Sequence, residues 1–291
     1  MRPGFVTKIA FLLLALLVGL VLVPALVLAY TVTRPLNHPI CCQTPADFGA
    51  AYETIRFQTG DGLWLASWYI PPSQGKAVII LLHTYYADRR QVLPVARMLS
   101  AQGYGILMYD QRASGESQGD SRSLGWRDIP DLGAATEWLA SRATSPAIGV
   151  YGCSMGASIA LAGAANLPVI RAAVLDAPSP LGYRENLPQF NPRDPLMLPI
   201  MGLYYPIVML RSRALPPSTT LQAVKQFGQR PLLFISSGAG NEKMRIETYF
   251  AAAQGPRTLW NLPTASHCSG PQQAPLEYSQ HLLDFFNTNL P

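Results

Sequence analysis

The sequence contains few charged residues, few histidines and few cysteines. Asp, Glu, Lys and Arg together make up 13% of the 291 residues, about half of the roughly 25% that soluble domains usually contain. The net charge of +5 comes from scattered lysines and arginines, so a nucleic-acid partner is not expected. The four cysteines form neither a CxxC pair nor a Cys/His zinc pattern. We therefore expect neither a structural metal nor a fold built on disulfides.

The chain does contain one long apolar run, from Ile9 to Tyr30, without a charged residue. Its length matches the roughly 20 helical residues that cross a bilayer core, so it predicts a single transmembrane helix. The alternative is a cleaved signal peptide, because Val27-Leu-Ala29 offers small residues at a possible cleavage site. The run is longer than a secretory apolar region of roughly 7 to 15 residues, which favours the anchor.

Basic residues near this run indicate its orientation. Arg2 and Lys8 precede it, and Arg34 is the only Lys or Arg between Tyr30 and Ile55. This asymmetry predicts a cytoplasmic N-terminus and a globular part outside the cytoplasm, although one added charge could reverse it.

The remaining sequence divides into a tether and one domain. Residues 1–30 are the expected anchor, and residues 31–46 have the composition of a tether rather than of an element. Residues 47–291 are long enough for one large domain with a buried core. Tyr52–Phe57 alternates like a half-buried strand, and Asp61-Gly62 indicates a turn into a hairpin partner.

Beyond the hairpin, continuous apolar runs alternate with stretches of helical periodicity, which predicts a three-layer α/β domain with a mostly parallel sheet. The further expected strands are 77–82, 106–109, 148–151, 172–175, 232–235 and 258–260, and the expected helices are 89–102, 128–142, 155–166 and 276–287. A Pro-rich interval at about 178–230 interrupts this alternation and is interpreted as a cap. An irregular connection covering one face of the sheet is the alternative.

A possible nucleophile lies in Gly152-Cys-Ser154-Met-Gly156, between an expected strand and an expected helix. Small residues beside the serine allow the sharp strand-to-helix turn that exposes its hydroxyl, and the helix N-terminus with the Met155 N–H can stabilise an oxyanion. Among four histidines, His267 is the candidate base because it follows the last expected strand, after the serine in the chain. The alternative is an ordinary loop histidine.

Several motifs together resemble those of single-pass membrane α/β-hydrolases of the lysophospholipase, esterase and peptidase-like group, over about residue 47 to the end. Leu81-Leu-His83-Thr84 is similar to the family's strand followed by HG, and the segment from Asp110 to Ser117 is similar to DxRGxGxS. The other two motifs are the Gly152 to Gly156 turn and Ser266-His267, which is similar to GxGH. The resemblance implies the α/β-hydrolase fold and assigns the oxyanion-hole N–H groups to Tyr85 and Met155.

The sequence departs from this family pattern at two places. Thr84 and Tyr86 replace glycines of the oxyanion loop, which predicts narrower access. Gly240 stands where the family has its catalytic aspartate. Glu242 is our first candidate for the acid and Asp176 our second, and a chain without a functional acid is the third possibility.

The sequence thus predicts a serine hydrolase that cleaves an ester, lysolipid or other acyl bond through a Ser154 acyl-enzyme, with no cofactor and no metal. A peptide or amide is the second substrate class. The anchor would bring the site to membrane lipid. The rival hypothesis is a weakly active or inactive membrane-tethered binding or scaffold protein on the same fold. A disulfide between Cys153 and Cys268, which flank Ser154 and His267, is a further hypothesis.

Overall fold

The structure, a computed structural model, describes residues 3–142, 147–182, 185, 196–237, 240–263 and 265–290. Its centre is a sheet of eight strands in the order β10-β9-β8-β7-β4-β5-β3-β2. These strands are β2 (Glu53–Gln58), β3 (Trp64–Ile70), β4 (Val78–Leu82), β5 (Gly105–Tyr109), β7 (Ile148–Cys153), β8 (Ile170–Asp176), β9 (Leu232–Ser236) and β10 (Arg257–Asn261). β3 pairs antiparallel with β2 and β5, and the remaining pairs are parallel. The predicted mostly parallel α/β fold is confirmed.

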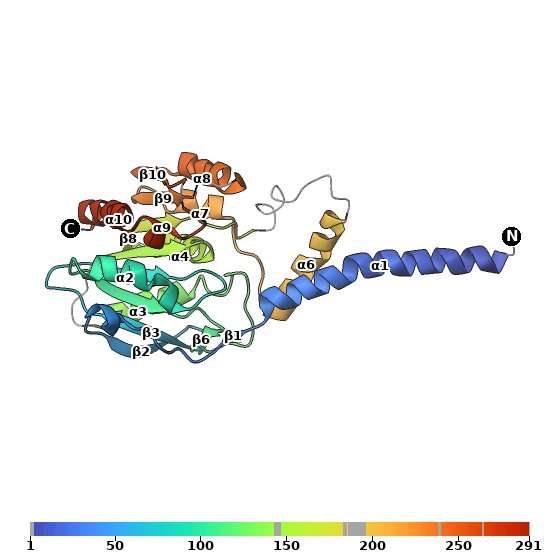
Figure 1. The fold of residues 1–291 in the computed structure, drawn as a ribbon, viewed down its shortest axis with the longest axis horizontal. Helices are drawn as coiled ribbons and strands as arrows, with labels where there is room; N and C mark the ends of the chain where they lie inside the picture. The colour runs from blue at the N-terminus through green and yellow to red at the C-terminus, as the bar shows by residue number, and fades with distance from the viewer. Residues whose placement is uncertain are drawn as a thin grey trace.

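Helices cover both faces of this sheet (Figure 1). α2 (Leu93–Ser100) and α10 (Pro275–Asn289) share one apolar cluster with Ile79 and Leu81 of β4. On the other face are α3 (Asp131–Ala140), α4 (Met155–Ala165), α7 (Thr220–Gln226) and α8 (Gly240–Ala252), which share a second cluster with Val78, Ile80 and Leu82. Successive β4 side chains alternate between the two clusters, because residues of a strand point to opposite faces. An apolar run without alternation is therefore buried on both faces.

The first helix, α1 (Pro3–Thr33), projects away from the domain (Figure 1). Its segment Thr7–Thr33 is the one helix among the described residues that is long and apolar enough to cross a membrane. Its length also suits a signal anchor. Beside it lies α6 (Met197–Ser212), from the interval predicted to be a cap. Residues 183, 184 and 186–195 of that interval lie outside the described residues.

The segment after α1 is more ordered than its composition predicts. It contains β1 (Leu36–Asn37), which pairs in parallel with β6 (Ser114–Gly115), and the short helix η1 (Pro45–Phe48). The prediction that residues 31–46 contain no element is therefore wrong. This segment is ordered by backbone pairing with a distant loop, since the Leu36 N–H donates to the Ala113 carbonyl at 2.8 Å. A local sequence pattern does not reveal such a pairing.

Candidate active site

Ser154 occupies a tight turn between β7 and α4. Its φ of 55° and ψ of −119° put a residue with a Cβ in a sparsely populated region, which costs of order 1–3 kcal/mol. The two glycines of the motif make this turn possible. A Cβ on Gly152 would collide with the Gly156 backbone, and a Cβ on Gly156 would collide with backbone atoms of Leu82 and His83. The spacing of the motif is therefore a packing requirement.

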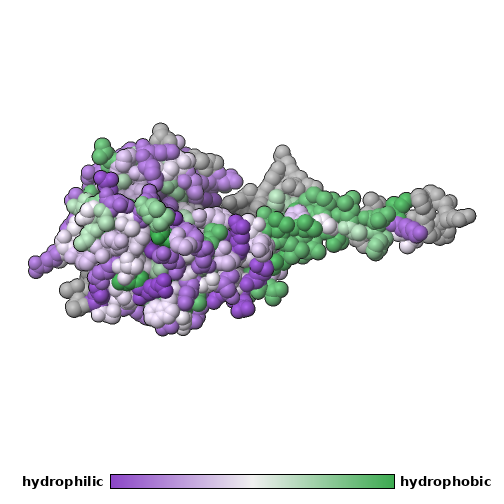
Figure 2. Space-filling view, turned by 60° about the horizontal axis from the view of Figure 1, so that its bottom comes forward, coloured by the Kyte–Doolittle hydropathy of each residue, from purple (hydrophilic) through white to green (hydrophobic). Residues whose placement is uncertain are grey.

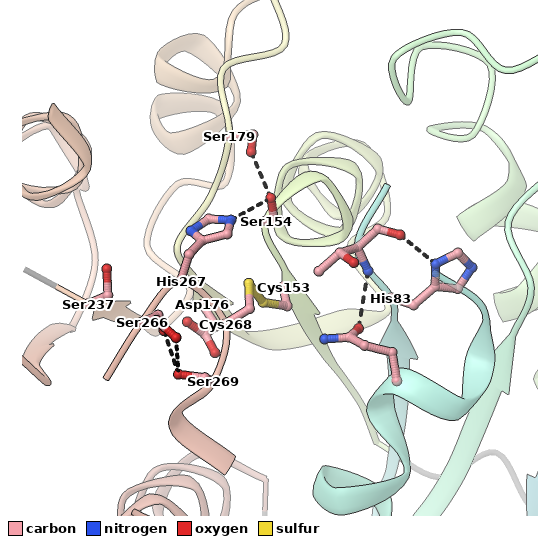
Figure 3. The surroundings of a disulfide bond; sticks show 12 residues. His83, Cys153, Ser154, Asp176, Ser179, Ser237, Ser266, His267, Cys268 and Ser269 are labelled. Atoms are coloured by element: carbon pink, nitrogen blue, oxygen red, sulfur yellow. Dashed lines mark hydrogen bonds between the residues drawn. A yellow bond between two sulfur atoms is a disulfide. The ribbon is translucent and has the colours of Figure 1, made fainter. Parts of the chain in front are cut away.

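The serine, His267 and Glu242 form a continuous chain of hydrogen bonds. His267 Nε2 lies 2.9 Å from Ser154 Oγ (Figure 3), and His267 Nδ1 lies 2.7 Å from Glu242 Oε2. His267 lies in the loop between β10 and α9 (Gly270–Gln273), and Glu242 lies on the first turn of α8. With Nδ1–H donating to the carboxylate, Nε2 is free to accept the serine proton. This is the geometry of a nucleophile, a base and an orienting acid.

Glu242 is suited to this contact by its charge. Burial raises the pKa of its carboxyl group, but hydrogen bonds from His267 and Ser237 outweigh burial and hold the pKa below its usual value. Ser237 donates its N–H at 2.8 Å and its hydroxyl at 2.6 Å to Glu242 Oε1. The carboxylate is thus ionised at neutral pH, and both of its oxygens have partners.

Asp176, the second candidate acid, lies elsewhere. It ends β8, is 3% exposed, and its Oδ2 accepts hydrogen bonds from the hydroxyls of Tyr278 at 2.7 Å and Tyr151 at 3.3 Å. Burial raises the pKa of Asp176 to about 6, against the effect of the Tyr278 hydroxyl. Among the described contacts, Glu242 and not Asp176 hydrogen-bonds His267, so Asp176 has the surroundings of a structural carboxyl group.

This raised pKa predicts a pH dependence of stability. Between the ordinary pKa of 3.8 and the folded pKa of about 6, the folded protein retains a proton that the unfolded chain releases. The contribution of Asp176 to the free energy of unfolding therefore falls as the pH rises through this window, by about 3 kcal/mol for two pKa units. We expect Asp176→Asn to unfold at a higher temperature than the wild type at pH 8 and to lose that advantage near pH 4. Thermal unfolding of both proteins in detergent checks this, and a difference that does not change with pH would contradict it.

Ser154 opens into a pocket of about 570 Å³ that includes both predicted oxyanion-hole residues. Met155 is the first residue of α4, where backbone N–H groups have no partner within the helix. Tyr85 follows β4, and the exposed ring of Tyr86 lies beside it at 5.2 Å between centroids. The remaining lining residues are Thr84, Gln91, Ser179, His267, Cys268, Ser269 and Gln272. The pocket thus brings the two predicted oxyanion-hole residues and His267 around Ser154.

The loop that carries Tyr85 is held by the end of α1. The Tyr85 hydroxyl donates to the Val32 carbonyl at 2.6 Å. Arg122 donates from Nη1 to the Tyr85 carbonyl at 2.8 Å, from Nε to the Arg34 carbonyl at 2.9 Å and from its backbone N–H to the Thr33 carbonyl at 2.9 Å. Carbonyls at a helix C-terminus lack partners within the helix and attract cations. The end of α1 and the pocket wall are therefore one hydrogen-bonded unit.

A disulfide joins Cys153 and Cys268, as hypothesised, with their Cα atoms 6.1 Å apart. Each cysteine is the chain neighbour of one member of the Ser154–His267 pair, so the bond holds β7 and the histidine loop together. The sulfurs and the Asp176 carboxylate form the one compact group of potential metal ligands among the described residues. Paired sulfurs are not thiolates, and the thiolate is the form of cysteine that binds metals.

Two residues at the site were not predicted from the sequence. The Ser179 hydroxyl lies 3.0 Å from Ser154 Oγ, and Ser237 orients Glu242. Ser237 follows directly after β9, and Ser179 lies three residues after the end of β8, so both are at the carboxyl edge of the sheet. Ligands bind at that edge in open α/β sheets, so polar residues at strand ends were the available signal.

The sheet, the serine at the turn between β7 and α4, and the histidine after the last strand define a hydrolase of the α/β-hydrolase fold. Comparison with known proteins agrees with this class. Residues 61–247 match the sequence model of the family described as X-Pro dipeptidyl-peptidase (S15 family), and the protein belongs to this peptidase S15 family.

The individual proteins that match this chain share low sequence identity with it. An uncharacterized protein of Mycobacterium tuberculosis is 25% identical over 216 residues, which cover 72% of this chain and 70% of the relative. A polyketide transferase of Penicillium, grgF, is 29% identical over 129 residues, 43% of this chain and 44% of its own. Among solved structures, the esterase Pf2001 of Pyrococcus furiosus superposes with a TM-score of 0.69 and 25% identity, covering 89% of this chain and 99% of the esterase. The predicted hydrolase family and fold are thus confirmed.

Proposed function

We propose that this protein is a membrane-anchored serine hydrolase that cleaves an ester bond of an acyl or lysolipid substrate. In this mechanism Ser154 attacks the carbonyl carbon, and His267 takes the serine proton and returns it to the leaving alcohol. Water then attacks the acyl group, with His267 taking the proton of the water and returning it to Ser154 as the acyl group leaves. The Tyr85 and Met155 N–H groups stabilise the oxyanion, and Glu242 orients His267. The observation that carries the proposal is the continuous Ser154–His267–Glu242 hydrogen-bond chain.

The pocket lining favours an ester over the free N-terminus of a peptide. A dipeptidyl-peptidase binds a substrate with a free amine, and a protonated amine buried in a pocket needs an acidic partner. None of the described residues that line the pocket is acidic, and Tyr85, Tyr86 and Met155 give it an apolar wall. Glu242 is occupied by His267 and Ser237. Cleavage of an X-Pro peptide, the activity in the family's name, is the second candidate.

Labelling with a fluorophosphonate tests the nucleophile. We expect the full-length protein in detergent to gain one covalent adduct, detected by intact mass, because a hydrogen-bonded base activates Ser154. Ser154→Ala should abolish the adduct, whereas Ser141→Ala should not, because Ser141 follows the end of α3 and is exposed. Absence of an adduct on the folded wild-type protein would favour the inactive binding protein. Turnover of p-nitrophenyl acyl esters against Gly-Pro-p-nitroanilide then separates the esterase from the peptidase.

We further propose that α1 spans the membrane once, with its N-terminus in the cytoplasm and the hydrolase domain outside. Arg2 and Lys8 before the apolar run, against Arg34 alone after it, support this orientation. The Cys153–Cys268 disulfide supports it independently, because such bonds persist in oxidising compartments.

Two free, exposed cysteines allow a direct test of the orientation. Cys41 and Cys42 lie on the domain side of α1. We expect a membrane-impermeant maleimide to label them in intact cells, and Cys41→Ser combined with Cys42→Ser to remove the label. Labelling that appears only after the membrane is permeabilised would place the domain in the cytoplasm.

A further inference from the structure

The cap helix α6 packs on the part of α1 that is nearest the domain (Figure 1). Among the described side chains of α1, those with no exposed surface are Ala25, Ala29 and Thr33, spaced by four. Small residues at this spacing allow two helices to approach closely, as in helix pairs within membranes. α6 buries Ile200, Met201, Tyr204, Tyr205 and Val208. The two helices thus form an apolar pair that is continuous with the apolar cluster on one face of the sheet.

Contacts at one end fix how α6 runs along α1. Arg211, in the last turn of α6, donates from Nε to Thr33 Oγ1 at 2.8 Å. Its guanidinium lies 4.9 Å from the centre of the Tyr30 ring. From there the packing extends to Val21, which lies against the same cluster as Ile200 and Met201. The ten residues from Val21 to Tyr30 rise about 15 Å, or roughly half of a 30 Å hydrocarbon core.

The exposed face of α6 is apolar. α6 has no charged residue from Met197 to Leu210. Leu198 is 52% exposed, Leu203 39% and Leu210 80%. Figure 2 shows that the hydrophobic surface is concentrated on this projecting part, whereas the hydrolase domain is mostly hydrophilic. The exposed face of α6 is therefore continuous with the surface of α1 that lipid would cover.

We propose that α6 is immersed beside α1 in the half of the bilayer nearest the hydrolase domain. In this arrangement Leu198 and Leu203 contact lipid acyl chains, and Arg211 lies at the headgroup level. The proposal rests on the proposed membrane span of α1, because the depth of α1 determines the depth of α6. It commits to lipid as the partner, since the exposed face continues that of α1 and lacks charges that would specify a protein.

This arrangement also identifies the substrate class. Tyr205 of α6 stacks on Trp126 at 6.4 Å between ring centres, and the cluster that contains both also packs against Tyr85 of the pocket. α6 therefore connects lipid on one side with the wall of the active site on the other. The substrate is an acyl ester dissolved in the bilayer, reaching Ser154 from the membrane rather than from water.

Spin labels test the depth of α6 in the full-length protein reconstituted in phosphatidylcholine vesicles. Single cysteines replace Leu198 or Leu203 in a Cys41→Ser, Cys42→Ser background, with the disulfide kept oxidised. Leu17→Cys on α1 is the lipid reference, and Leu276→Cys on α10, 87% exposed, is the water reference. We expect nitroxides at 198 and 203 to resemble the label at 17, with high collision rates with oxygen and low rates with a water-soluble nickel chelate.

The other outcomes are distinct. Water-like labels at 198 and 203 beside a lipid-like label at 17 would overturn the proposal and leave the anchor intact. A water-like label at 17 would overturn the anchor as well. Spin–spin broadening at 203 that is lost on dilution with unlabelled protein would assign this face to a second copy of the chain, against our proposal.

A functional measurement distinguishes this proposal from failure of the proposed chemistry. We expect Leu198→Asp combined with Leu203→Asp to lower turnover of a vesicle-embedded acyl ester at least tenfold while turnover of a water-soluble ester is unchanged. Leu276→Asp is the matched control and should change neither rate. Equal loss on both esters would contradict the proposed delivery from lipid, and no turnover of either ester by the wild type would contradict the proposed function itself.

Discussion

Glu242→Gln is expected to slow acylation of Ser154 by about 10⁴-fold, the effect of replacing the orienting acid of a triad with an amide. The glutamine side chain has nearly the same shape, but its amide can present N–H to His267 Nδ1 and so favour the tautomer with the proton on Nε2. That proton would then face Ser154, and the imidazole could not accept the serine proton. The present geometry joins Nδ1 to Glu242 Oε2 at 2.7 Å.

The rate of fluorophosphonate labelling measures this effect, and two variants control for it. Glu247→Gln changes a carboxylate on the same helix that pairs with Lys243 at the surface, and it should label at the wild-type rate. Asp176→Asn should remain within several-fold of the wild type, because Asp176 contacts Tyr151 and Tyr278. If Asp176→Asn slowed labelling as much as Glu242→Gln did, Glu242 would not be the sole acid.

Arg122→Ala is expected to lower kcat for ester hydrolysis by about 10²-fold with little change in KM, the lower end of the effect of losing one oxyanion donor. Arg122 is a positioning residue, because it holds the Tyr85 carbonyl and the last carbonyls of α1. Without it the loop that carries the Tyr85 N–H keeps only the bond from the Tyr85 hydroxyl to the Val32 carbonyl as its described hydrogen bond to α1. An oxyanion interaction forms only in the transition state, so its loss appears in kcat.

Two further variants separate positioning from general destabilisation. Tyr85→Phe keeps the backbone N–H and loses the bond to the Val32 carbonyl, so its kcat should lie between those of the wild type and Arg122→Ala. Arg127→Ala removes an arginine that pairs with Asp61 outside the pocket and should keep the wild-type kcat. A parallel loss of kcat and of melting temperature in all three variants would show that Arg122 only stabilises the fold.

Much of the fold could be predicted because its signals are local. The apolar runs that are buried on both faces and the glycines around Ser154 reflect short-range requirements of strands and of a tight turn. Ser154 and His267 could be proposed from the sequence because Ser154 follows directly after a predicted strand and His267 lies in the loop after the last one.

The features that were missed, or left open between alternatives as the acid was, depend on contacts between distant segments. Glu242 reaches His267 because α8 begins at Gly240, which turns the acid toward the site two residues later than the family pattern places it. The bond between Tyr85 and Val32 joins residues 53 positions apart. The pairing of β1 with β6 likewise needs the assembled fold. These contacts depend on the length of the side chains and on how distant segments meet in the folded chain. Neither can be derived from the periodicity of apolar residues in the sequence.

The disulfide also encloses Ser154, Glu242 and His267 in a covalent ring. Its two cysteines are 115 positions apart, and the ring between them contains α6, α7 and Glu242. A protease that nicks an exposed loop of the cap once would open this ring without separating the chain into two molecules. Ser154 and His267 would remain on linked fragments, so the nicked enzyme would migrate as two bands only after reduction.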